Sequence, residues 1–79
     1  MATLESVSNC VVTGNIGAVT GEVQALIDGG VAPASIINDG LIAGMNIVGP
    51  RFKAGEMFVP EVLMAAKAMA AGVDLVKPL

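Results

Sequence analysis

The stretch PASIINDGLIAGMNIVGPRFK, residues 33–53, decides the fold class of this chain. Its large apolar residues recur three or four positions apart, which is the spacing of one face of an α-helix and not the alternation of a β-strand. Pro33 suits the first turn, because the amide hydrogen that proline lacks would have no helical partner there. Pro50 should kink or end the helix, which we expect to reach about Arg51 to Lys53. The apolar positions are Ile36, Ile37, Leu41, Met45, Ile47 and Val48.

Two further helices are predicted before this stretch. The first covers about residues 3–13, with Thr3 as its N-cap and Gly14 at its end. The second covers about residues 15–28 and has Asn15 as its N-cap. Both segments repeat their apolar residues at helical spacing and are separated by glycine.

The last predicted helix follows Gly55, has Pro60 in its first turn and stops at Pro78. Four helices joined by short loops predict an all-α fold, a four-helix antiparallel bundle that forms a single domain over residues 1–79. The predicted apolar face of the last helix consists of Val59, Val62, Leu63, Ala66, Met69, Ala70, Val73 and Val76.

Two pairs of glycines lie four residues apart inside these predicted helices. We interpret Gly40 and Gly44 as a site of close packing against a neighbouring helix; the alternative is a small-residue face that admits the edge of a ligand. Gly17 and Gly21 each weaken the second helix by about 1 kcal/mol relative to alanine. Either tertiary packing compensates for that loss, or a close helix approach requires both glycines.

The composition excludes several classes of protein. The chain is 54% hydrophobic and only 14% charged, against about 25% charged in an ordinary domain, so part of its surface should be covered by a ligand, a second domain or another copy. A net charge of −3 without a basic cluster argues against binding to nucleic acid or an anionic membrane.

No signal peptide or membrane-spanning run is evident. Cys10 is the sole cysteine, which we read as an apolar filler, and a cytoplasmic location is expected.

Residues for catalysis are few. Without histidine the chain has no ordinary imidazole base, and it has no Glu-x-x-His pair for a di-iron site. Glu56 and Glu61 could act as a carboxylate pair, but solvated charges near a helix start are the favoured interpretation. We therefore predict no catalytic residue and no metal ligand.

Residues 38–69, NDGLIAGMNIVGPRFKAGEMFVPEVLMAAKAM, carry a family resemblance. They resemble the helical cap module of cobalamin-dependent methionine synthase and of the small corrinoid proteins of methylotrophic and acetogenic microbes. The shared pattern is Gly-Leu-x-x-Gly-Met, then Val-Gly-x-x-Phe, then Gly-Glu-x-Phe-Leu-Pro-Glu, then a helix rich in Met and Ala that ends in Lys-Pro. The match is almost continuous over the second half, with weaker echoes at residues 11–15 and 28–33.

The resemblance implies roles for particular residues. In that family the bundle covers the upper face of the corrin and shields a cobalt-bound methyl group. Phe52 stands at the position of the main capping aromatic, and Val59 and Val62 stand at two further apolar contacts. Val59 replaces a larger leucine of the family pattern, which puts the tightness of that contact in doubt. Phe58 is expected to lie in the core.

The resemblance also implies what lies outside this chain. In the family a Rossmann-like domain follows the bundle and supplies a histidine beneath the cobalt, so this chain is expected to give the upper-face contact to cobalamin only, as a fragment or a separate cap. It would be non-catalytic alone and a component of a cobalamin-dependent methyltransferase system. Its expected partners are the downstream Rossmann-like cobalamin domain and methyltransferase subunits. The alternative is a helical interaction module without cofactor, which forms a homodimer through the apolar cap face.

Overall fold

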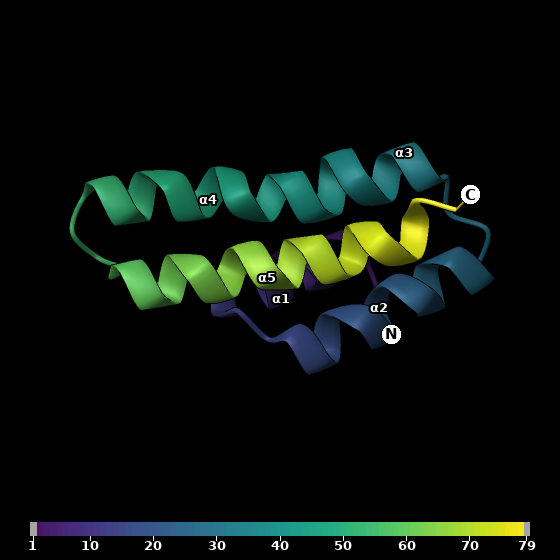
Figure 1. Ribbon diagram of the computed structural model, residues 1–79. Coiled ribbons are helices and arrows are strands. Elements are labelled where there is room, and N and C mark those ends of the chain that lie inside the picture. The colour runs from purple at the N-terminus through teal and green to yellow at the C-terminus, as the bar shows by residue number, and fades with distance from the viewer. Residues whose placement is uncertain (1, 79) are drawn as a thin grey trace.

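The computed structural model describes residues 2–78 and contains helices but no strand within them. α4 and α5 run antiparallel and side by side (Figure 1); α1 packs against both of them, and α2 packs against α5 and α1. The predicted all-α four-helix bundle is confirmed, because the segment from residue 33 to residue 53 is one continuous helix made of three pieces. The elements are α1 (Leu4–Thr13), α2 (Ile16–Asp28), α3 (Pro33–Ser35), the π-helical turn η1 (Ile36–Leu41), α4 (Ile42–Lys53) and α5 (Val59–Val76).

The ends of the first two helices are set by local hydrogen bonds, as the sequence predicts. The Thr3 hydroxyl accepts from the Ser6 amide at 3.0 Å, and the Ser6 hydroxyl accepts from the Thr3 amide at 2.8 Å. α1 ends at Gly14, whose φ of 67° is a left-handed conformation that glycine adopts without steric cost. The Asn15 side chain then accepts from the Ala18 amide at 3.1 Å and starts α2.

The π-helical turn η1 is a feature that the sequence does not predict. In an α-helix, residues five apart point in directions roughly 140° apart. Ile36 and Leu41 are five apart, yet both are completely buried. The wider π turn takes up about one additional residue and brings both side chains to the core face.

The two pairs of glycines have different surroundings. A Cβ atom on Gly44 would lie 2.7 Å from Val11 Cβ and 2.8 Å from the Ser8 carbonyl oxygen, so α4 and α1 touch through this glycine. The close-packing interpretation of the pair that includes Gly44 is therefore confirmed, and α1 occupies the face that a ligand edge would need. Gly21 of the other pair is exposed, with nothing within 4 Å of an added Cβ. Close helix approach is thus the wrong explanation there.

The core is built from apolar side chains of every long helix. The predicted apolar face of α5 is wrong in part: Val59, Leu63 and Ala70 are exposed, while Ala65 and Gly72 are buried. α5 turns its small residues inward because the bundle approaches it closely there. The buried hydrophobic residues are Val7, Val11, Val19, Val23, Leu26, Ile36, Leu41, Val48, Met57, Ala65, Ala68 and Val76.

Cys10 is half-buried on α1 and packs against this core. Burial, and after it the carboxylate of Glu22, raises the pKa of the Cys10 thiol. The Glu22 carboxylate accepts a hydrogen bond from the Ser6 hydroxyl at 3.0 Å. A protonated, partly covered thiol agrees with the interpretation of Cys10 as an apolar filler.

Between residues 2 and 78, no helix combines the length and the apolar character that crossing a membrane requires.

Candidate cofactor-covering face

Exposed apolar side chains gather at the end of the bundle where α4 passes into α5. Figure 1 shows this connection at the left end of the molecule, away from the C-terminus. Large hydrophobic side chains are normally the most buried in a small domain, so a group of them in one place indicates a surface that meets something else. The exposed members at this end are Phe52, Phe58, Val59, Leu63 and Met64.

The three residues for which the family resemblance implies cofactor contact all lie here, on the two sides of the α4–α5 loop. Phe52 is in the last turn of α4 and is 44% exposed. Val59 is the first residue of α5, and Val62 follows one turn later, half-buried against the core. Residues three apart on a helix share a face, so Val59 and Val62 point to the same side of α5. We call Phe52, Val59 and Val62 the cap face.

Phe58 corrects one prediction. It was expected in the core, but its side chain is 72% exposed. The residue is the N-cap of α5 and has an extended backbone, and its amide donates to the Glu61 carboxylate at 3.1 Å. That bond fixes the backbone just before the helix, and Met57 is the residue that turns inward, with 7% exposure. Helical periodicity says nothing about an N-cap residue, because its side chain lies outside the repeating pattern.

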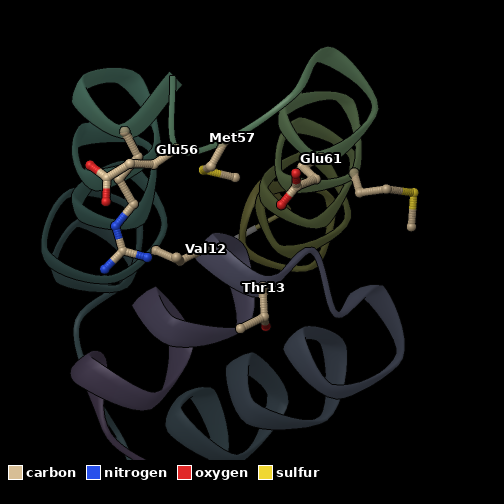
Figure 2. Close-up of a pocket in the computed structure, with 7 residues that line it drawn as sticks. Val12, Thr13, Glu56, Met57 and Glu61 are labelled. Carbon is tan, nitrogen blue, oxygen red and sulfur yellow. The ribbon is translucent and has the colours of Figure 1, made fainter. Parts of the chain in front are cut away.

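A hollow of about 480 Å³ lies behind the loop, between the end of α1, the end of α4 and the start of α5 (Figure 2). Figure 2 shows Glu56 on the α4 side and Glu61 on the α5 side, with Met57 between them. Both glutamates are exposed, and Glu61 caps α5, which agrees with their interpretation as solvated charges near a helix start. The lining residues are Val12, Thr13, Arg51, Glu56, Met57, Glu61 and Met64.

The chemical groups of the cap face limit what this end of the bundle can bind. The cap face presents carbon and hydrogen only, from one aromatic ring and two branched aliphatic groups. Residues 2–78 hold no group of three or more His, Cys, Asp or Glu side chains that could bind a metal ion. The arrangement can therefore cover an apolar surface and exclude water from it.

Comparison with known proteins shows the family to which the chain belongs. Residues 3–77 match the family described as the B12 binding domain. The chain is 39% identical over 74 residues to monomethylamine corrinoid protein 2 of Methanosarcina acetivorans, a match that covers 94% of this chain and 34% of the relative. It is 55% identical over 51 residues to the dimethylamine corrinoid protein of Methanosarcina barkeri, which covers 65% of this chain and 24% of the relative.

Comparison of the fold with solved structures also finds a corrinoid protein. The solved structure of the Methanosarcina barkeri monomethylamine corrinoid protein superposes with a TM-score of 0.92 at 31% identity, over 95% of this chain and 35% of that one. The chain thus spans about a third of the length of the relatives that it matches. Sequence and fold agree over nearly all of its residues, and the chain belongs to the B12 binding domain family.

Proposed function

We propose that this chain is the cap of a corrinoid methyl-carrier protein in a methyltransferase system. In this proposal Phe52, Val59 and Val62 cover the upper face of cobalamin and shield its methyl group. The observation that carries the proposal is the exposure of Phe52 and Val59 at one end of a bundle that matches a corrinoid protein over 95% of its length. A group of exposed apolar side chains of this kind marks a surface that another molecule or domain covers.

The residues present fit the upper face of the cofactor. Cobalamin supplies a cobalt–carbon bond from which a methyl group is transferred. The chain's part is to keep water and unwanted nucleophiles away from that bond, which needs apolar bulk and not acids or bases. Each Å² of apolar surface removed from water contributes about 25 cal/mol, so a few side chains hold the cap closed only modestly. A lid must also open, and a modest closing energy allows that.

The rest of the carrier lies outside this chain in the proposal. The relatives have about two thirds of their length beyond the matched segment, and we assign to that part a Rossmann-like domain that holds cobalamin from below. Methyltransferase subunits then deliver and remove the methyl group while the cap is displaced. The cap is not catalytic by itself. A half-buried Cys10 with no second cysteine to pair with in this chain suits a cytoplasmic carrier.

Replacing Phe52 with alanine tests this function. The chain would replace the matching segment of monomethylamine corrinoid protein 2, and the hybrid would be loaded with methylcobalamin. Burial of a phenylalanine contributes about 1.5–3 kcal/mol in full, and Phe52 has about half of its surface to contribute. Phe52→Ala should therefore shift the cap toward its open state by about fivefold and speed photolysis of the methyl–cobalt bond. Absorbance spectra during illumination measure that rate.

Ile47→Ala is the matched control. Ile47 is also apolar, exposed and on α4, but five residues from Phe52 it points about 140° away around the helix. Its loss should leave photolysis unchanged. Val59→Leu, which restores the larger side chain of the family pattern, should slow photolysis. Equal rates in the wild type, Phe52→Ala and Val59→Leu would disprove the capping function.

A second candidate function is self-association through the same end of the bundle. The exposure of Phe52, Phe58, Val59, Leu63 and Met64 in one region favours it. Sedimentation velocity of the chain without cofactor should then show a dimer that dissociates on dilution, and Phe58→Ser should weaken it. A monomer at every concentration would rule out this candidate and leave the capping proposal intact.

A further inference from the structure

We propose that residues 49–56 form a flap that moves as one unit on the bundle and carries Phe52 toward and away from Val59 and Val62, the other two residues of the cap face. Phe52 lies in this segment, while Val59 and Val62 lie outside it on α5. The motion itself follows from this chain's own packing and hydrogen bonds. Its purpose, to move Phe52 away from the methyl group as the cap opens, rests on the proposed function.

The flap is defined by a run of exposed residues. Every residue from Gly49 to Glu56 is exposed, whereas the neighbours on each side, Val48 and Met57, are buried. The start of α5, residues 59–64, also lacks a fully buried side chain, but Val62 there is half-buried and packs against the core. A segment without buried apolar contacts has little to hold it to the core and opens at low cost. The core thus ends at Val48 and resumes at Met57.

The connection between the flap and the rest of α4 is weak. Pro50 lies inside the helix and has no amide hydrogen, so the carbonyl of Asn46 lacks the donor that an α-helix supplies at this position. Gly49, the preceding residue, has nothing within 4 Å of an added Cβ, so no contact requires a glycine there. Glycine in a helix adds backbone freedom that alanine would remove. Residues 49 and 50 together make a hinge.

Inside the flap the chain is well bonded. The Gly55 amide donates to the Phe52 carbonyl at 3.1 Å, and the Glu56 amide donates to the Arg51 carbonyl at 2.9 Å. These two bonds, with a φ of 82° at Gly55, make a closed turn of the Schellman type. The Ala54 amide also donates to the Pro50 carbonyl at 2.9 Å. The segment is therefore loosely attached but internally held, which is what rigid-body motion requires.

The space beneath the flap is not filled by side chains. The 480 Å³ hollow has Arg51 and Glu56 of the flap on one side and Thr13, Glu61 and other residues of the bundle on the opposite side. Figure 2 shows Glu56 and Glu61 separated across it, with Thr13 below. A filled interior would resist displacement, because packed atoms cannot be compressed. The hollow gives the flap room to move without a rearrangement of the core.

Hydrogen exchange on the chain without cofactor tests the flap. The amides of Arg51, Phe52 and Lys53 are the ones that bond back across the hinge in an α-helix, so they exchange when the flap swings. In the wild type they should exchange at least about tenfold faster than those of residues 45–48 in the same helix. The double variant Gly49→Ala/Pro50→Ala restores a donor and removes the glycine. It should slow exchange at residues 51–53 by about tenfold.

Gly21→Ala is the matched control, because Gly21 is also exposed, helical and without atoms within 4 Å of an added Cβ. It should stabilise the bundle but leave exchange at residues 51–53 unchanged. The flap is overturned if residues 51–53 are as protected as residues 45–48, or if Gly21→Ala slows them as much as the hinge variant does. The exchange measurement uses no cobalamin, so it tests the flap separately from the capping function. The flap can be disproved while Phe52→Ala still changes photolysis, and the capping function can be disproved while the exchange result supports the flap.

Discussion

Replacing Gly44 with alanine should lower the free energy of unfolding by about 2–3 kcal/mol, the effect of overpacking a closed interface. The new Cβ would meet Val11 Cβ at 2.7 Å and the Ser8 carbonyl oxygen at 2.8 Å. The second contact is to backbone, which no rotamer change can relieve, so α4 and α1 must separate. A chain of 79 residues has a total stability of only about 4–12 kcal/mol, so the loss is a large part of it. Urea unfolding followed by circular dichroism measures it.

Gly21→Ala provides the comparison for Gly44→Ala. The chemical change is the same and both glycines are helical, but an added Cβ on Gly21 meets nothing. Its helix should gain about 0.5–1 kcal/mol, as an alanine in place of an exposed glycine does. If both variants were stabilised equally, the contact between α1 and α4 would have to be looser than described.

Leu41→Ala should cost about 3 kcal/mol, within the range for a leucine removed from a core. Leu41 is fully buried in η1, and its methyl carbon would lie 2.6 Å from a Cβ on Gly72 of α5. The loss leaves a cavity between η1 and α5 that other side chains fill only in part. Thermal and urea unfolding give the free energy of each variant.

The partner substitution Gly72→Ala sharpens this prediction. By itself it should destabilise the bundle less than Gly44→Ala does, because the atoms it meets are the movable end of the Leu41 side chain. In the double variant the alanine at position 72 fills part of the cavity, so the combined loss should be smaller than the sum by about 1 kcal/mol. Additive losses would show that Leu41 and Gly72 do not share this space.

Helix positions and their caps could be predicted from the sequence because the forces behind them are local. Thr3 and Asn15 accept hydrogen bonds from amides three residues on, and Gly14 takes a left-handed turn; each requires only its neighbours along the chain. The π turn at residues 36–41 could not be predicted, since it arises from the need to bury two side chains against other helices. Tertiary packing determines this π turn, and the spacing of apolar residues along one helix does not show how that helix packs against the others.

The site could be predicted in part. Phe52, Val59 and Val62 come from a family pattern and not from spacing, and the structure places them at one end of the bundle with Phe52 and Val59 exposed. Their contact with cobalamin stays a prediction. Phe58 was wrongly expected in the core, because composition alone favours burial of an aromatic residue. Val59 and Leu63 of α5 were also expected inside but are exposed, and alanine and glycine occupy the close contact.

That choice of small residues affects the entropy of folding. A buried leucine gives up about 0.5–1 kcal/mol of rotamer freedom at room temperature, whereas a buried alanine gives up none. Ala65 and Ala68 line the inner side of α5, so at these two positions the helix is ordered against its neighbours without loss of side-chain freedom. Two of the side chains in α5 that do have rotamers to lose, Leu63 and Met64, remain exposed. These side chains lose their rotamer freedom only when another surface binds them. The entropy lost at that step lowers the affinity of the binding.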